Sequence, residues 1–172
     1  MKSIAKYAII KGKYFHYIRI RIFYFLNSGG LNPMYKKILL ASDGSNFALR
    51  AADQAIKLAS LSGDAVIEII YVVDLETSKR DAIYYMDSDI IQEERKKRLK
   101  LTEEKIKASG VNYHSSILYG EPGPAIVTYA NENKFDVVVL GSRGLNALQE
   151  MVLGSVSHKV AKRVQCPVMI VK

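Results

Sequence analysis

Three glycine positions near the C-terminus have a spacing that could serve phosphate binding. Gly141 ends an apolar run, Gly144 comes three residues later, and Gly154 directly precedes Ser155. Glycine loses more backbone freedom on folding than any other residue, so an ordered chain keeps it where bare backbone is needed. Backbone N–H groups at a helix N-terminus bind phosphate, and glycine lets the anion approach closely. The spacing alone leaves a second interpretation open, in which these glycines only form turns.

Other sites for chemistry have little support in the sequence. Neither G-x-x-x-x-G-K-[ST] nor a G-x-G-x-x-G after the first predicted strand occurs. No serine or cysteine nucleophile has a recognisable histidine partner, so we predict no catalytic residue. We expect His158 to be a surface or packed residue and Cys166, the only cysteine, to belong to the core.

Strand and helix patterns alternate from Met34 to the C-terminus. Short apolar runs predict strands at 36–43, 65–74, 111–120, 135–141 and 166–172, and helical spacing predicts helices at 45–63, 89–110, 122–134 and 155–164. Residues 75–88 are polar and irregular, so we expect a loop there. Strands separated by helices predict an α/β doubly wound fold, with a mainly parallel five-stranded sheet and helices on both faces.

Two predicted strand ends carry small and polar residues, "ASDGS" at 41–45 and "GSRG" at 141–144. Sheets of this kind bind ligands beyond the carboxyl ends of their strands, where the strand order reverses. If both segments flank that reversal, they form one crevice. Asp43 then has two interpretations, as a turn former before the first helix or as a ligand-binding carboxylate at the mouth of the crevice.

The positive charge of the chain is concentrated in its first 33 residues. The whole sequence has a net charge of +8, but residues 1–33 hold six lysines and arginines and no acid. The remaining 19 basic and 17 acidic residues give a net charge of only +2, so we predict no nucleic-acid partner. A single cysteine excludes a disulfide framework within the chain and favours the reducing cytoplasm.

Residues 1–33 form a basic, aromatic extension that we expect to lie outside the fold, with translation from Met34 as one explanation. Charged residues interrupt their apolar runs, so they match neither a signal peptide nor a membrane span. The alternating "YIRIRIFYF" leaves a membrane-surface or edge-strand role as the alternative.

Residues 34–172 resemble the universal stress protein family, in its ATP-binding branch. The resemblance rests on "MYKKILLASDGS", "IIYVVD", "GEPGPAIVTYA", "DVVVLGSRG" and "VLGSVSHKVAKRVQCPVMIVK", which occur in the family's order. That branch is identified by G-x2-G-x9-G-[ST], which Gly141, Gly144, Gly154 and Ser155 match without a gap. The resemblance implies the same nucleotide-binding fold as the adenine-nucleotide alpha hydrolases and a single domain over 34–172.

The resemblance also implies roles for individual residues. The adenosine end of ATP would meet one strand end and the late second strand, and the ribose and phosphates would meet the glycine motif. AMP or ADP are alternative ligands, and Mg²⁺ or Mn²⁺ is expected beside the phosphates, with metal ligands unassigned. The residues implied for the nucleotide are Ala41, Ser42, Asp43, Val72, Gly141, Arg143, Gly144, Gly154, Ser155, Val156 and Ser157.

The function implied is that of a cytoplasmic, ATP-binding regulatory protein of the stress response. The final strand, Pro167–Lys172, is expected at the sheet edge, where it would pair with its twin in a homodimer; an unknown protein partner is also implied. The alternative is a slow ATPase or a nucleotidyl-transferring enzyme on the same fold. A third interpretation is an interaction protein that binds no nucleotide.

Overall fold

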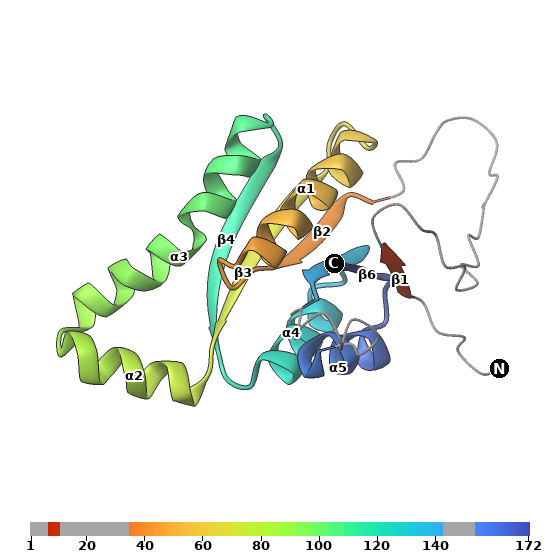
Figure 1. Ribbon diagram of the computed structural model, residues 1–172. Coiled ribbons are helices and arrows are strands. Elements are labelled where there is room, and N and C mark those ends of the chain that lie inside the picture. The colour runs from red at the N-terminus through yellow and green to blue at the C-terminus, as the bar shows by residue number, and fades with distance from the viewer. Residues whose placement is uncertain (1–6, 11–34, 143–153) are drawn as a thin grey trace, which may run out of the picture.

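The computed structural model describes residues 7–10, 35–142 and 154–172 (Figure 1). From residue 35 onward, strands alternate with helices, as the sequence pattern predicts. The strands are β2 (Lys37–Ala41), β3 (Val66–Val73), β4 (Asn112–Tyr119), β5 (Val137–Gly141) and β6 (Val168–Val171). The helices predicted between them are α1 (Asn46–Ser60), α3 (Ser88–Ala108), α4 (Pro122–Glu132) and α5 (Ser155–Arg163).

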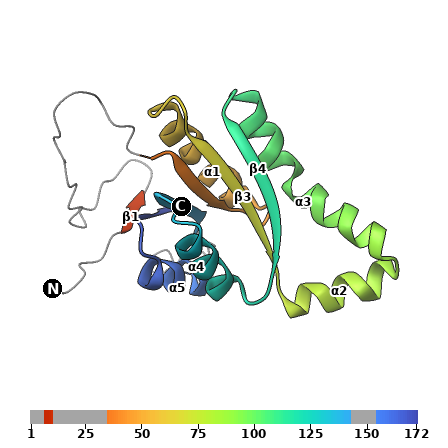
Figure 2. The same cartoon turned by 180° about the vertical axis from the view of Figure 1, so that it is seen from behind.

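These five strands form a parallel sheet that is covered by helices on both faces, which confirms the predicted α/β architecture (Figures 1 and 2). Alternate residues of β2 point to opposite faces, so Ile38 and Leu40 enter one core and Leu39 enters the other. The first core also contains side chains of α1 and α3, and the second contains side chains of α4 and α5. The central strands β2 and β5 are therefore buried on both faces, as their apolar sequences require.

The order of the strands places a reversal beside β2. The sheet runs β6-β5-β2-β3-β4, so the chain extends from β2 through β3 to β4 and then continues on the other side of β2 with β5. Helix α1 follows β2 on one face, and α5 follows β5 on the other. The carboxyl ends of β2 and β5 thus diverge into two layers, which is where such sheets bind ligands.

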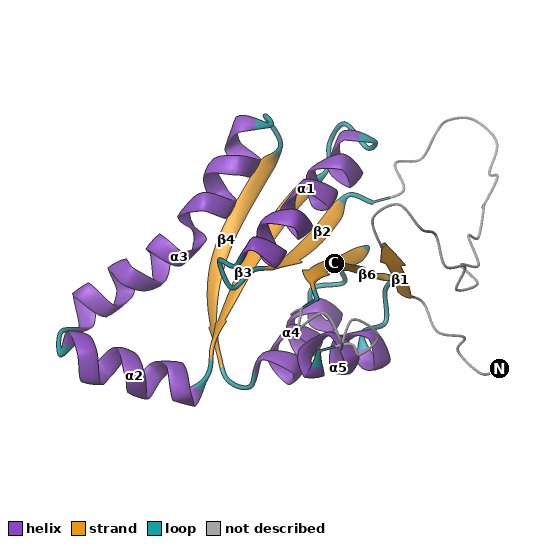
Figure 3. Cartoon of the chain, viewed as in Figure 1, coloured by secondary structure: helices purple, strands orange, loops and turns teal. Residues whose placement is uncertain are grey.

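Helix α2 (Leu75–Tyr85) lies where we expected a loop (Figure 3). The Asp74 carboxylate caps it by accepting from the backbone N–H of Thr77 at 2.7 Å. Its one buried residue is Asp81, which Arg95 and Arg98 of α3 neutralise. The prediction was wrong because α2 packs through a buried ion pair, and an apolar stripe, the signal sought in the sequence, is absent from it.

A sixth strand, β1 (Tyr7–Ile10), pairs in parallel with β6 over four residues, from Tyr7 opposite Val168 to Ile10 opposite Val171. In the described part of the chain, β6 is therefore an inner strand, and the expectation that it ends the sheet was wrong. The physical reason is that an apolar strand edge presents unpaired N–H and C=O groups, which the "YAII" segment satisfies. Part of the N-terminal extension thus joins the sheet (Figure 1).

Within the described residues, no helix is both long enough and apolar enough to cross a bilayer.

Candidate functional site

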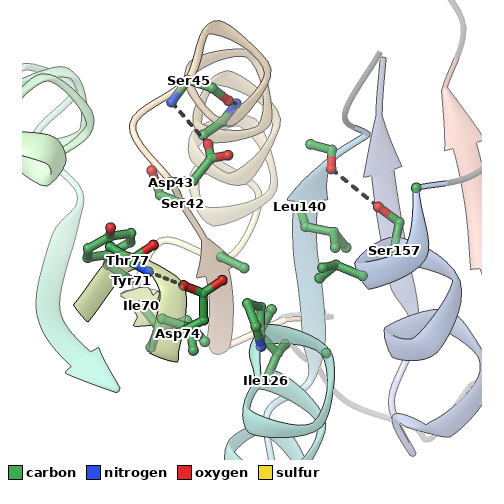
Figure 4. A pocket seen from close by; sticks show the side chains of 18 of the residues that line it. Ser42, Asp43, Ser45, Ile70, Tyr71, Asp74, Thr77, Ile126, Leu140 and Ser157 are labelled. Carbon is green, nitrogen blue, oxygen red and sulfur yellow. Dashed lines mark hydrogen bonds between the residues drawn. The ribbon is translucent and has the colours of Figure 1, made fainter. Parts of the chain in front are cut away.

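A cavity of about 970 Å³ opens at the carboxyl ends of β2, β3 and β5. It lies at the reversal of strand order, and residues from both helical layers line it (Figure 4). Nine residues predicted for the nucleotide line this cavity together: Ala41, Ser42, Asp43, Val72, Gly141, Gly154, Ser155, Val156 and Ser157. The other two, Arg143 and Gly144, lie outside the described residues.

The loop after β2 is held rigidly by local and tertiary hydrogen bonds. The N–H of Ser42 donates to the carbonyl of Ile70 at 2.9 Å, and its buried hydroxyl lies 3.0 Å from that of Thr102 in α3. The exposed Asp43 carboxylate accepts from the N–H of Ser45 at 3.0 Å, as in an Asx turn. Asp43 therefore forms the turn and faces the cavity, so the two interpretations of this residue are compatible (Figure 4).

Gly44 is required in this loop by both its backbone angle and its surroundings. Its φ is +76°, a region that side-chain-bearing residues rarely adopt. A Cβ at this position would lie 2.5 Å from the carbonyl oxygen of Arg98. Helix α3 therefore packs directly on the loop that carries Asp43.

The N-terminus of α5 forms the opposite side of the cavity. Gly154 occupies the N-cap position, and no side chain caps the helix there. The first N–H groups of a helix have no partner within the helix, so those at the start of α5 are donors suited to an anion. The buried hydroxyl of Ser157 donates to the carbonyl of Gly141 at 3.4 Å, which joins α5 to the end of β5.

Gly141 has a packing role that the sequence did not indicate. A Cβ on Gly141 would lie 2.7 Å from the carbonyl carbon of Phe47 in α1. Helix α1 comes this close because it presents mostly alanines to the sheet: Ala48, Ala51, Ala52, Ala55 and Ala59. The need for bare backbone at Gly141 is thus explained by helix packing, whether or not its backbone also faces a ligand.

The cavity has polar walls that the sequence analysis missed. Asp74 follows β3 and lines the cavity together with Asp43, while Lys159 of α5 forms an ion pair with Glu121 at the start of α4. Arg98 of α3 lines the cavity and donates to the hydroxyl of Tyr71 at 2.6 Å. No local pattern marks Arg98 or Lys159, because each reaches the site from a helix far along the chain. The position of Asp74 at the end of a strand was a usable signal.

Arg98 keeps its positive charge at the cavity. Burial disfavours the charged form, but Tyr71 and Asp81 more than offset that effect and raise the pKa of the guanidinium above its ordinary value. Arg98 is therefore a permanent cation beside the cavity.

A metal-binding cluster is not evident in the part of the chain that the structure describes. No group of three or more histidine, cysteine, aspartate or glutamate side chains there could hold a metal ion. Asp43 and Asp74 are the carboxylates that end neighbouring strands at the cavity.

Comparison with known proteins identifies the family of this chain. The model of the universal stress protein family matches residues 34–172. The chain is 36% identical over 156 residues to universal stress protein MJ0531 of Methanocaldococcus jannaschii, covering 87% of this chain and 91% of that protein. It is 38% identical over 149 residues to YxiE of Bacillus subtilis, covering 81% of this chain and all of the relative. The chain belongs to the universal stress protein family.

Solved structures of universal stress proteins share the fold. MJ0577, from the same archaeon as MJ0531, superimposes with a TM-score of 0.67 at 27% identity, over 81% of this chain and 97% of that one. A universal stress protein solved in complex with cAMP gives a TM-score of 0.59 at 28% identity, over 79% of this chain and 95% of that one. This universal stress protein therefore has a relative that binds a nucleotide.

Proposed function

We propose that this universal stress protein binds ATP in the cavity and acts as a nucleotide-dependent regulator of the stress response. The adenine would lie on the apolar floor formed by Ala41, Val72, Ile126 and Leu140. The phosphates would lie at the N-terminus of α5, on Gly154–Ser157 and on the glycine motif of residues 141–155. Backbone N–H groups and the helix dipole would bind them there.

The observation that carries this proposal is the meeting of two distant segments at one cavity. The loop Ala41–Ser45 and the start of α5 are more than a hundred residues apart in sequence, yet both line it. One offers carboxylate and backbone acceptors suited to a nucleoside, and the other offers N–H and hydroxyl donors suited to phosphate. The cAMP complex of a relative supports a nucleotide as the ligand.

A divalent cation would enter with the triphosphate. Because no three-residue metal cluster occurs among the described residues, Mg²⁺ or Mn²⁺ would keep mostly phosphate and water ligands. Asp43 and Asp74, which line the cavity at neighbouring strand ends, are the carboxylates proposed to contact such an ion or its waters.

Signalling rather than turnover is the proposed output, with a homodimer in the cytoplasm as the acting form. The proposed dimer contact is the edge of β6 that β1 covers in this structure, so a second copy of the chain would have to displace β1 in order to pair there. We expect ATP turnover well below about 1 per second, the lower end of ordinary enzymes.

Nucleotide binding is tested on the purified full chain. Mass spectrometry of released small molecules should detect an adenine nucleotide, and calorimetry with ATP and Mg²⁺ should give one site per chain. Saturation at about 100 times the dissociation constant should stabilise the fold by about 2.7 kcal/mol. A chain that carries no nucleotide and shows neither heat nor thermal shift with ATP contradicts the proposal.

A further inference from the structure

Two arginines line the cavity on the side away from α5. Arg80 lies on α2 and Arg98 on α3, and we call the surface made by Glu76, Thr77, Arg80 and Arg98 the α2–α3 wall. No residue of this wall belongs to the glycine motif. Its cations therefore need an explanation other than binding phosphates at the start of α5.

Arg98 is held in place by two anchors. One terminal nitrogen donates to the Tyr71 hydroxyl at 2.6 Å, and the other donates to the Asp81 carboxylate at 3.1 Å. Asp81 is 1% exposed and also accepts from Nε of Arg95 at 2.9 Å. A guanidinium carries more N–H donors than these two bonds use, and the Arg98 side chain remains 29% exposed at the cavity.

The wall keeps an excess of positive charge. One carboxylate, Asp81, is shared by two arginines, so the buried cluster of Asp81, Arg95 and Arg98 is itself a net cation. Arg80, one residue before Asp81, adds an exposed guanidinium on the cavity side. Glu76 is the acid on this wall, and its partner is Lys79, 3.5 Å away. Pre-positioned guanidinium groups of this kind suit phosphate, which they bind through paired N–H donors.

The order of charges across the cavity matches a particular ligand. Figure 4 shows Asp43 and Asp74 between Tyr71, which anchors Arg98, and Ser157 of α5. The strand order β5-β2-β3 places the β2 end, and with it Asp43, between the other two, whereas Asp74 follows β3, the strand of Tyr71. Donors thus flank a centre of carboxylate acceptors. A ribose offers hydroxyl donors to such a centre, and phosphates on both sides of it would meet the two donor sets.

We propose that the α2–α3 wall is a second phosphate subsite, which adapts the cavity to an adenine nucleotide with phosphates on both the 5′ and the 3′ oxygen of its ribose. This inference rests on the proposed nucleotide function. The 5′-phosphate lies at the start of α5, the ribose lies between the two aspartates, and the 3′-phosphate binds Arg98 and Arg80.

Calorimetry on the full chain with two ligands of equal phosphate number tests the subsite. ADP carries both phosphates on the 5′ side, whereas adenosine 3′,5′-bisphosphate carries one on each side. Arg98→Gln and Arg80→Gln should each lower the affinity for the bisphosphate about tenfold. The affinity for ADP should fall less than about twofold. Arg95→Gln is the matched control, because it removes a bond to the same Asp81 from a side chain that does not line the cavity. It should change neither affinity by more than about twofold.

The outcomes separate the subsite from the nucleotide site. The subsite is overturned if both cavity variants lose affinity for ADP and for the bisphosphate equally, or if neither variant loses affinity for either ligand. The proposal of ATP binding stands in both cases. If the unmodified chain binds none of ATP, ADP and the bisphosphate, the proposed function and the subsite both fail. Thermal unfolding checks each variant; should Arg98→Gln unfold, the exposed Arg80 still decides the test.

Discussion

The carbonyl oxygen of Arg98 occupies the space that a side chain on Gly44 would need, 2.5 Å from the position of its Cβ. Through this contact α3 lies directly on the loop that carries Asp43. The same residue of α3 extends its side chain to Tyr71 and Asp81. The geometry of the cavity therefore depends on how closely α3 approaches this glycine.

Replacing Gly44 should cost more than its backbone angle alone would require. Gly110 has nearly the same φ, +75°, with nothing within 4 Å of its missing Cβ. We expect Gly110→Ala to lower the free energy of unfolding by about 1 kcal/mol, from backbone strain. Gly44→Ala should lower it by about 3 kcal/mol, because the clash with α3 adds to that strain. Urea denaturation measures both unfolding free energies. Equal losses would mean that α3 shifts away from the new side chain without an energetic cost.

Substitution at Gly154 should affect ligand binding more than folding. Its φ of −56° is accessible to any residue, so Gly154→Val should cost only about 1 kcal/mol of stability as a poorer N-cap. The branched side chain would stand where phosphate approaches the first N–H groups of α5. We expect the affinity for ATP to fall by more than about tenfold in calorimetry. Gly154→Ala should have a smaller effect, and undiminished binding by the valine variant would refute the assignment.

Two substitutions separate the turn-forming role of Asp43 from its role in binding. Asp43→Asn keeps an oxygen that accepts from Ser45 N–H, whereas Asp43→Ala removes it. Asparagine should leave the unfolding free energy within about 0.5 kcal/mol, and alanine should lower it by about 1 kcal/mol. If the carboxylate accepts a hydrogen bond from the nucleoside, both substitutions should lower the affinity for ATP about tenfold. A variant set in which stability changes and affinity does not would confine Asp43 to the turn.

The buried charge on Asp81 should make a large contribution to stability. Asp81→Ala leaves Arg95, which is 5% exposed, without its carboxylate, so we expect the unfolding free energy to fall by about 3–5 kcal/mol. Glu104→Ala removes the exposed partner of Lys100, and both residues lie on α3. This substitution should lower the unfolding free energy by less than about 1 kcal/mol. Chemical denaturation compares the two. Similar costs would show that the buried cluster contributes no more than a surface pair.

Strand β1 and a second copy of the chain need the same edge of β6. Two prolines, Ala8→Pro with Ile9→Pro, remove adjacent N–H donors and should prevent β1 from pairing. With the edge open, the dimer fraction in light scattering should rise relative to the unmodified chain. Val168 and Ile170 are unsuitable for this test, because both are buried in the core. An unchanged molar mass would show that β1 and the dimer contact do not compete.

Most of the fold follows from local patterns, because strands and amphipathic helices repeat apolar residues with characteristic periods. The strands β2 to β6 and four of the helices were predicted in this way. Helix α2 was not, since its packing depends on Asp81 meeting Arg95 and Arg98 on another helix. The pairing of β1 with β6 was not either, because a strand edge has no sequence signature of its partner.

Some residues of the candidate site were likewise predictable from local sequence patterns, and others were not. The sequence by itself determined the family, the alternation of strands and helices, and the residues at the two strand ends and at Gly154 and Ser155, because these depend on local spacing. Only the tertiary structure brought Arg98, Asp74 and Lys159 to the same cavity and set Gly141 against Phe47. Contacts of that kind depend on the close approach of helices that are distant along the chain, and no short-range pattern encodes that distance.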